Sequence, residues 1–546
     1  MRRRLVVERL HAWMTRRDFL SAALSTAACL GLTGCCSPCS VTHLPRPSGV
    51  VDALMIDPHC HIFNAHDLDV FNYISGEITG YWRVSLGVVY AIAEILRAVA
   101  PTAEEELAVL DPLISKRTAR LKALPKMADA PQVNEQTKLE ATGTLEAYEA
   151  TIDERRRRIL DSPGSVKQLQ DRWEVRDKAA KSAGLPAADD ETTKVARRAS
   201  ARENFEEARL KLLEPRVAAF VDGLWFPRSV NALRLGRVYP EITLFTPAML
   251  DPDAWFQFRP YQPVERSTPL GLQMAVYERV AILTNGRFLP MLAFDPRHQA
   301  ESANDPESPL ELVARALQRK CFVGLKLYPP MGFRPARNAE RDASPPPNWP
   351  AGLGGRMDAI LDTLFERCAQ EELPCLAHAN RSHASDPMYL DDSRKEFWES
   401  ALNAHQALRI DLGHFGGMDD ASSWRGDFCD LMRAHPGVYA DTGDFDGITC
   451  AETRVAFFKA IVALDPPVRE RLMYGSDFYM NGVYDGYERY HDDWVAAFQD
   501  HFPDDWRRLV GGNAADFLGL RAGKQRQRLE EFVQDNRLSP TWLTRL

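Results

Sequence analysis

The stretch "ALMIDPHCHIF", residues 53–63, decides both the fold and the chemistry predicted for this chain. A short apolar run ends in His59 and His61, and His66 follows in the turn-like "NAHD". The chain has only 13 histidines in 546 residues, so three this close together need an explanation. Side chains two positions apart on a strand leave the same face, so a strand here points His59 and His61 in one direction. His66 is expected to be a loop residue.

From about residue 240 the chain repeats one pattern, in which short apolar runs alternate with helix-like stretches. The runs are "EITLFTPAML", "RFLPMLAFDP", "FVGLKLYPP", "LPCLAHAN", "LRIDLGHFGG", "GVYADTGD" and "RLMYGSDF". Together with the opening stretch they give eight candidate strands. Alternating strands and helices indicate an α/β fold with a parallel sheet, and eight such units predict a closed (β/α)8 TIM barrel. An open doubly wound sheet is the alternative, but no Gly-rich phosphate loop follows an early strand.

The sequence between the first two strands differs in character from the rest. Residues 80–235 are rich in Ala, Leu, Glu, Arg and Lys, with apolar positions at helical spacing. We therefore expect a large helical insertion between the first and second strands. The barrel then begins at residues 51–79 and resumes at residues 236–525, and residues 526–546 form a C-terminal tail helix.

The N-terminal residues are typical of an export signal. "MTRRDFLSAALSTAACLGLTGC", residues 14–35, pairs Arg16 with Arg17 ahead of an apolar run too short to span a bilayer comfortably. Residues 1–34 are predicted to be a twin-arginine signal, with an N-terminal anchor helix as the alternative. "LTGC" resembles a lipobox, so Cys35 is the expected lipidation site and residues 35–50 a tether. We expect a periplasmic or cell-envelope lipoprotein that meets the membrane only through this lipid anchor.

Charge and cysteine content exclude some classes of protein. The net charge of −9 gives no basic face for nucleic acid. Four of the ten cysteines cluster near the N-terminus and the other six are scattered without a CxxC pair, which is not a disulfide framework. The expected partner is a small-molecule substrate, and a homo-oligomer remains open.

Polar residues fall where the predicted strands end, which is where barrel enzymes place their chemistry. Lys326 lies in the fourth strand, His378 ends the fifth, His414 the sixth and Asp477 the eighth. Neutral imidazoles and a carboxylate suit a divalent ion, zinc in first place, with manganese and iron as alternatives. Such an ion lowers the pKa of a bound water towards about 7.

The order "DPHCH", "LAHAN", "LGHFGG", "YGSDF" resembles the amidohydrolase superfamily, in particular the branch that includes aminocarboxymuconate-semialdehyde decarboxylase. "GLKLYPPMGFRP" and "GGNAADFLGL" are also similar to that branch. The resemblance implies that His59, His61, His378 and Asp477 hold the metal. It implies that His414 and Asp477 handle the catalytic proton, although in binuclear relatives the residue matching His414 is itself a ligand. In some branches of the superfamily a fourth-strand lysine is carboxylated. For Lys326 the expected role is instead that of a substrate-binding cation.

The predicted reaction is hydrolysis of an ester, lactone or amide by metal-activated water. Non-oxidative decarboxylation of an unsaturated or aromatic acid is the alternative, and it needs a cation for the carboxylate. Lys326, Arg297, Arg334 and Arg381 all lie in or after predicted strands and are the candidates for substrate binding. A lipid-anchored binding protein without catalysis is the third hypothesis. The Pro- and Gly-rich loop of residues 334–355 is expected to lack regular structure and to cover the site as a lid.

Overall fold

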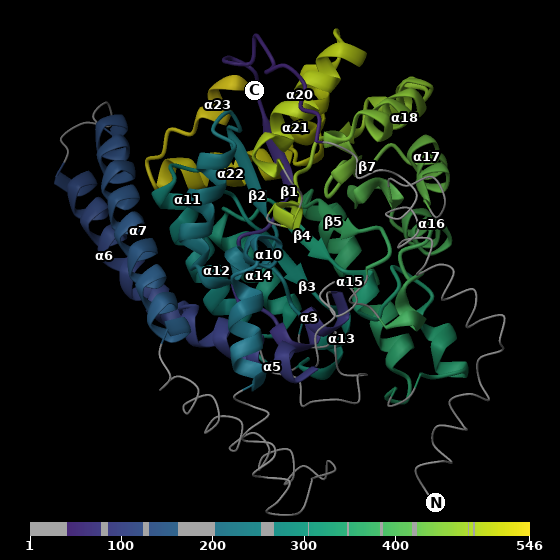
Figure 1. Cartoon of the computed structure of the whole chain (residues 1–546). Coiled ribbons are helices and arrows are strands. Elements are labelled where there is room, and N and C mark those ends of the chain that lie inside the picture. The colour runs from purple at the N-terminus through teal and green to yellow at the C-terminus, as the bar shows by residue number, and fades with distance from the viewer. Residues whose placement is uncertain are drawn as a thin grey trace, which may run out of the picture.

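A computed structural model gives the architecture of the chain (Figure 1). It describes residues 41–77, 86–123, 130–161, 203–252, 267–303, 305–346, 349–382, 386–417, 423–478, 480–483 and 486–546. The predicted export signal and Cys35 lie outside the described residues.

All eight expected strands are present, and every strand pairing is parallel. They are β1 (Ile56–Cys60), β2 (Leu244–Pro247), β3 (Met291–Phe294), β4 (Gly324–Leu327), β5 (Cys375–His378), β6 (Ile410–Gly413), β7 (Val438–Asp441) and β8 (Leu472–Met473). β1 pairs with β2, and β3 to β8 form a second sheet in chain order. The strands are short and almost entirely buried, as parallel strands covered on both faces must be. The fold class is α/β.

Backbone contacts join the two sheets at both of their ends. Ala248, just after β2, bridges to Met291 of β3, and Cys60 of β1 bridges to Phe478 beyond β8. The amide of Asp477 donates to the carbonyl of His59 at 2.7 Å. The first and last strands therefore lie side by side at their carboxyl ends, and residues 418 positions apart along the chain meet there.

Helices alternate with the strands from β2 onwards, as the sequence pattern predicts. The helices and short helical turns are α12 (Leu270–Leu283), α13 (Pro296–Glu301), α14 (Pro309–Arg319), η2 (Pro329–Met331), η3 (Asn338–Ala343), α15 (Leu353–Glu371), η4 (Pro387–Tyr389), α16 (Lys395–Ala404), η5 (His414–Gly416), α17 (Arg425–Ala434), η6 (Asp446–Thr449), α18 (Ala451–Val462), α19 (Pro466–Arg469), η7 (Met480–Val483), η8 (Tyr487–Arg489), α20 (Tyr490–His501), η9 (Arg508–Gly512), α21 (Asn513–Phe517), α22 (Gly523–Asp535) and α23 (Thr541–Arg545). The C-terminal region thus holds two helices, α22 and α23, where one tail helix was expected.

The long connection between β1 and β2 contains α3 (Val70–Glu77), α5 (Leu86–Val99), α6 (Ala103–Ala123), α7 (Ala130–Asp161), α10 (Pro215–Trp225) and α11 (Arg228–Val238). Figure 1 shows α6 and α7 as a long pair along one flank, and Arg120 of α6 pairs with Glu140 of α7 at 2.6 Å. Arg228 pairs with Asp67 and Glu106, all three fully buried. A buried ion pair needs both partners to stay together, so this cluster ties the connection to the segment after β1.

The described part of the predicted tether is docked on α20. Asp493 of α20 accepts from the His43 ring at 2.7 Å and from the Leu44 amide at 2.9 Å. Cys450, beside this segment's contact with Thr449, is disulfide-bonded, whereas Cys60, Cys321, Cys368, Cys375 and Cys429 are free. Among the described residues no helix combines the length and the apolar character needed to cross a membrane.

The expectation that residues 334–355 lack regular structure is wrong. The segment contains η3 and the start of α15, and Asn338 donates to Asp358 through its amide at 2.9 Å. Arg341 pairs with Asp392, and both side chains are buried. Polar contacts at closely spaced positions hold the described part of this segment against Asp358 and Asp392, and none of its described residues lines the cavity described below.

Candidate metal centre

The turns that follow β6 and β8 bend sharply and carry two of the predicted site residues. His414 has φ = 67° and Asp477 has φ = 50°, in the left-handed region that non-glycine residues rarely occupy. Such backbone strain persists only where the surroundings enforce it, and it is common at functional sites. Here it directs both side chains into the mouth of the strands.

His59, His61 and Asp477 converge on one point. The Nε2 atoms of His59 and His61 lie 3.5 and 3.2 Å from Oδ1 of Asp477. One ligand atom from each residue lies within 4.8 Å of the other two, and all three residues are buried. These are donors and spacings that a divalent ion uses.

Hydrogen bonds on the far side of each ring fix which nitrogen is free. His59 donates from Nδ1 to Oδ2 of Asp441 at 2.8 Å, and His61 donates from Nδ1 to the carbonyl of Ala248 at 3.0 Å. With Nδ1 protonated in each ring, Nε2 carries a lone pair and faces the centre. Ligating histidines are held in this way in metal proteins.

These assignments leave electron pairs facing one another. Nε2 of His61 and Oδ1 of Asp477 are both acceptors, yet they stand 3.2 Å apart in a buried site. A cation between these atoms removes the repulsion, so the residues present fit a metal ion.

His378 and His414 form a second pair of rings in the same cavity. Nδ1 of His414 donates to the carbonyl of Gly443 at 3.0 Å, and its Nε2 is 3.1 Å from Nδ1 of His378. Nε2 of His378 is buried and has no hydrogen-bond partner among the described residues. Burial lowers the pKa of His414 to about 4 and that of His378 well below its usual value, so both rings are neutral at pH 7.

Lys326 lies against the metal ligands. Its Nζ is 3.0 Å from Nε2 of His59, so the ammonium donates to the nitrogen that a metal ion would use. Burial lowers the pKa of Lys326, and the nearby Asp477 and Asp441 oppose that change. A bound ion must compete with Lys326 for the lone pair of His59.

Asp441, at the end of β7, is a site residue that sequence reasoning missed. Its Oδ2 holds His59, and its Oδ1 accepts from the amides of Gly443 at 2.7 Å and His414 at 3.2 Å. A Cβ on Gly413 would lie 3.0 Å from the His59 ring, and one on Gly443 would lie 2.9 Å from Nδ1 of His59. These glycines let the backbone close around the ring and its carboxylate. "YADTGD" was a predicted strand end, which is the signal that could have found Asp441.

A second buried acid, Asp411 on β6, lies near Asp441 and Lys326. Burial and then the charge of Asp441 raise the pKa of Asp411 well above its usual value. Burial opposes ionisation of Asp441 too, but His59 and His414 hold its pKa below the usual range. The pKa values of these two neighbouring acids are therefore shifted in opposite directions.

The structure brings some predicted substrate-binding residues together and not others. Lys326 and Arg381 line a cavity of about 150 Å³ with the metal centre at its base, and Tyr328 and Tyr73 add aromatic walls. Arg297 and Arg334 do not line it. Arg297 is buried beside Glu301 at 3.1 Å.

Local contacts explain the positions of Arg334 and His66. Arg334 pairs with Glu340 at 3.1 Å and stacks on Phe397 at 4.3 Å, away from the cavity. His66 bonds to the carbonyl of Ala100 at 3.1 Å through Nε2 and does not line the cavity, in line with a loop residue.

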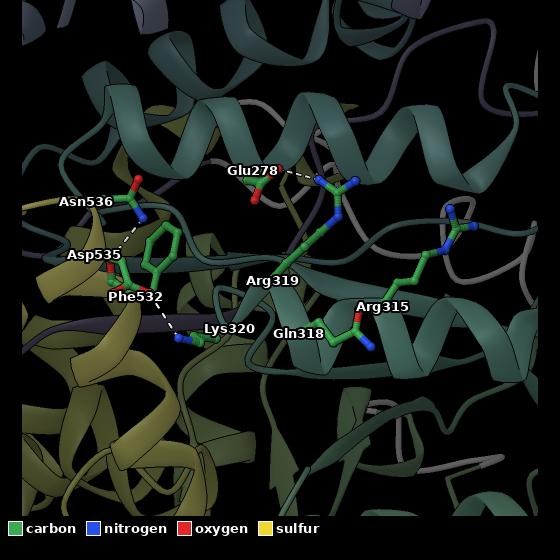
Figure 2. Close-up of a pocket in the computed structure, with 8 residues that line it drawn as sticks. All are labelled: Glu278, Arg315, Gln318, Arg319, Lys320, Phe532, Asp535 and Asn536. Carbon is green, nitrogen blue, oxygen red and sulfur yellow. Dashed lines mark hydrogen bonds and ion pairs between the residues drawn. The ribbon is translucent and has the colours of Figure 1, made fainter. Parts of the chain in front are cut away.

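A larger hollow of about 430 Å³ lies outside the sheet, between α14, α12 and α22, and we call it the outer groove (Figure 2). Its charges are paired within the protein: Arg319 with Glu278, Arg315 with Glu307, and Lys320 with Asp535 at 2.9 Å. It brings together no group of histidines and acids that could hold a metal in the described residues. Size alone therefore does not mark it as a site.

A family model described as Amidohydrolase matches residues 242–520, slightly more than half of the chain. The chain belongs to the amidohydrolase family. His378, His414 and Asp477 lie inside the matched region, whereas β1 with His59 and His61 precedes it. The structure brings the two parts together at one site, and the protein is an enzyme of this family. No curated protein matches the chain.

Several solved structures are similar at low identity. A zinc-bound amidohydrolase from Burkholderia multivorans is 13% identical, with 53% of this chain and 91% of that chain covered at a TM-score of 0.35. The putative 2-pyrone-4,6-dicarboxylic acid hydrolase of Pseudomonas putida is 15% identical, with 54% and 88% covered at 0.32. The manganese-bound 5-carboxyvanillate decarboxylase of Novosphingobium aromaticivorans is 11% identical, with 56% and 85% covered at 0.35. TM-scores this low carry no conclusion about fold or activity.

Proposed function

We propose that this protein is a metal-dependent hydrolase that adds water to the carbonyl of an ester, lactone or amide in a small molecule. The observation that carries the proposal is the pair of facing acceptors, His61 Nε2 and Asp477 Oδ1, 3.2 Å apart. His59, His61, His378 and Asp477 would hold one divalent ion, zinc in first place and manganese or iron as alternatives. That ion supplies Lewis acidity towards the carbonyl and makes water a nucleophile at neutral pH.

The chain's own residues supply the proton transfer and the orientation of the substrate. The carboxylate of Asp477 can accept the proton that an attacking water gives up. Lys326 and Arg381 line the cavity and present cations to an anionic group of the substrate. Tyr328 and Tyr73 offer faces for an unsaturated or aromatic ring. A small unsaturated or aromatic carboxylate that also carries a hydrolysable bond fits these groups best.

Non-oxidative decarboxylation is the second candidate, and one observation favours it. Two cations, Lys326 and Arg381, share the cavity with the metal centre, and a leaving carboxylate needs such partners. The non-catalytic binding protein is the weaker hypothesis, because the chain belongs to an enzyme family and three of the four proposed ligands, His59, His61 and Asp477, lie together.

Three further features belong to this proposal. We propose that the eight strands close into a (β/α)8 barrel, supported by the bridges between β2 and β3 and between β1 and the segment after β8. We propose, from the sequence, export by the twin-arginine route and a lipid anchor at Cys35. A homo-oligomer is compatible with these features.

Elemental analysis of the signal-free protein, purified without added metal, is the first test. We expect about one divalent ion per chain, as a mononuclear centre requires, and loss of that ion in a His59→Ala/His61→Ala double variant. Absence of metal, with no uptake on reconstitution, would contradict the proposal. The loaded enzyme is then given carboxylated aryl esters, lactones and amides in ¹⁸O water, with carbon dioxide measured in parallel. ¹⁸O in the product supports hydrolysis, whereas carbon dioxide release moves the assignment to decarboxylation.

A further inference from the structure

We propose that Tyr73, which the long connection between β1 and β2 places in the wall of the cavity, sets the size of the apolar group that a substrate can carry. The substrate is then an aromatic carboxylate with a single ring. Its carboxylate lies at the cationic side of the cavity and the far edge of its ring lies against Tyr73. This inference rests on the proposed metal-dependent function and assigns a specificity-determining residue to it.

The side chains around the cavity divide by chemistry and by origin. The apolar ones come from α3 and from the segments after β1, β2 and β8, and they are Phe63, Tyr73, Leu250 and Met480. The polar ones that are not proposed ligands come from β4 and from the segments after β5 and β7, and they are Lys326, Asn380, Arg381, Ser382 and Asp444. Because β1 adjoins both β2 and the segment after β8, the apolar side chains come from neighbouring segments.

Contacts at both ends hold Tyr73 in this wall. Its amide donates to the carbonyl of Asp69 at 2.9 Å, and its hydroxyl donates to Sδ of Met480 at 3.3 Å. Met480 belongs to the turn after Asp477, where its amide donates to the carbonyl of Asp477 at 2.8 Å. The hydroxyl contact therefore joins the long connection to the turn that carries a proposed metal ligand, and only 7% of Tyr73 is exposed.

The volume of the cavity sets the scale of the substrate. It measures about 150 Å³, and a cavity of about this volume accommodates one benzene ring. Phe63 and Leu250 are 3% and 6% exposed, so a ring placed against them is removed from water on that side. The apolar side of the cavity thus favours one ring over a longer or fused apolar group.

A substrate that spans the cavity meets opposite chemistry at its two ends. Lys326 and Arg381 attract an anionic group, and the hydroxyl of Tyr328 on the same side donates to Ser382 at 3.2 Å. A carboxylate placed against Tyr73 would instead lose its hydration beside apolar side chains. The orientation that suits both ends therefore points the carboxylate at the cations and the ring at Tyr73.

A series of para-alkyl benzoates measures the size limit. Isothermal titration calorimetry of the zinc-loaded enzyme gives dissociation constants for benzoate, para-ethylbenzoate and para-butylbenzoate. In wild type we expect para-butylbenzoate to bind at least about tenfold more weakly than benzoate, because the added methylene groups meet the Tyr73 ring. Tyr73→Ala should bind para-butylbenzoate about tenfold to a hundredfold more tightly than wild type does, since each methylene group that enters an apolar site is worth about fourfold. Its affinity for benzoate should change little.

A substitution at the other side of the cavity tests the orientation. Benzoate could also bind zinc directly through its carboxylate, without help from the cations. Arg381→Gln should weaken binding of all three benzoates by a similar factor, about tenfold to a hundredfold, as for a lost hydrogen bond to a charged group. Unchanged affinities in this variant would show that the metal alone holds the carboxylate, and they would overturn the orientation.

Controls separate the size of the wall from the packing of α3. Tyr73→Phe keeps the ring and removes only the hydroxyl, so its preference among the benzoates should match that of wild type. Tyr90→Ala removes a ring that packs edge-on against Phe71 of α3 at 6.0 Å but does not line the cavity, so the preference should again be unchanged. Met480→Ala enlarges the same side from another segment. It should shift the preference in the same direction as Tyr73→Ala, and it replaces that variant if circular dichroism shows misfolding.

Other outcomes overturn the inference. Wild type that binds benzoate and para-butylbenzoate alike has no size limit at this wall. A ratio of the two affinities that neither Tyr73→Ala nor Met480→Ala changes excludes the role, and an equal shift in Tyr90→Ala makes the effect one of packing. Zinc-loaded wild type that does not bind benzoate contradicts the assigned substrate class. A wild-type protein that takes up no zinc removes the proposed function first, so the two failures can be told apart.

Discussion

The metal centre and the outer groove are both hollows lined by charged side chains, and they differ in how those charges are partnered. In the groove each cation has an acid beside it, as Lys320 has Asp535 at 2.9 Å (Figure 2). At the metal centre, acceptors face acceptors, as His61 faces Asp477 at 3.2 Å. The groove is the larger hollow, at about 430 against 150 Å³.

The difference teaches that neither the size of a hollow nor the number of charges that line it identifies a metal site. Buried acceptors that face one another without a donor between them do identify one. Exposed ion pairs contribute little and can form wherever opposite charges meet on a surface. Buried lone pairs directed at one another are costly unless something is meant to lie between them. Four substitutions can break or sharpen this comparison.

An Asp→Asn substitution made once in each hollow should give the largest difference in bound metal and in kcat. Asp477→Asn removes the only carboxylate among the proposed ligands, so we expect loss of the bound ion and a fall in kcat of about a hundredfold to ten-thousandfold, the range for losing a catalytic base. Asp535→Asn in the outer groove should leave both unchanged. Elemental analysis and steady-state kinetics measure the effect, and similar behaviour of the two variants would end the distinction.

Asp441→Asn tests the carboxylate that holds His59. An amide can present its N–H₂ to Nδ1 and so turn the ring's proton to Nε2, which would then be unable to ligate. Metal affinity should fall about tenfold to a hundredfold. Asp411→Asn is the matched control, because Asp411 is a neighbouring buried acid and the substitution has the same size and shape. Chelator competition on both variants decides, and an equal response would show that Asp441 has no special role.

His491 tests whether burial of a ring nitrogen is enough by itself to create a metal site. Its Nδ1 has no hydrogen-bond partner in the described residues, it lies outside the cavity, and burial lowers its pKa from 6.5 to about 3. Between pH 3 and 6.5 the unfolded state therefore binds more protons at this residue than the folded state does. The contribution of neutral His491 to the free energy of unfolding is full above pH 6.5 and is lost as the pH falls towards 3. In that range the free energy of unfolding falls by up to about 1.4 kcal/mol for each pH unit of acidification.

His491→Phe should flatten that slope without changing the bound metal. Chemical denaturation at a series of pH values gives the slope, with His501→Phe at an exposed position as the control. An unchanged slope in the His491 variant would mean that other groups set the acid sensitivity.

The smallest effect is expected in the outer groove itself. Arg319 pairs with Glu278, and the two side chains are 28% and 20% exposed, so solvent screens the pair. Arg319→Gln should lower the free energy of unfolding by less than about 1 kcal/mol and leave metal content and kcat alone. Loss of activity in this variant would reveal a role for the groove that its contacts do not indicate.

Strand-end positions made much of the site predictable. His59, His61, His378, His414 and Asp477 were found because alternation along a strand and the common edge of parallel strands bring such residues together. Asp441 ends a strand too, but a lone aspartate does not indicate a metal ligand, and its role depends on a distance across 382 residues of sequence.

Contacts with near neighbours explain what the sequence could not settle. Arg297, Arg334 and Arg381 all follow strands, and each pairs with a nearby acid. Only Arg381 also lines the cavity. The segment of residues 334–355 was expected to be irregular because of its Pro and Gly content. Asn338 instead bonds to Asp358, and Arg341 pairs with the buried Asp392, which proline and glycine counts do not reveal.

The contact between the ends of β1 and β8 has a consequence for how the molecule is made. The carbonyl of His59 accepts from the amide of Asp477, so the proposed metal centre needs both β1, the first strand synthesised, and the segment after β8, the last strand. Such long-range closure is slow and comes late in folding. A chain still short of residue 477 holds His59 and His61 without the carboxylate of Asp477. The complete set of proposed ligands therefore exists only near the end of synthesis, and a product truncated before residue 477 is expected to be inactive.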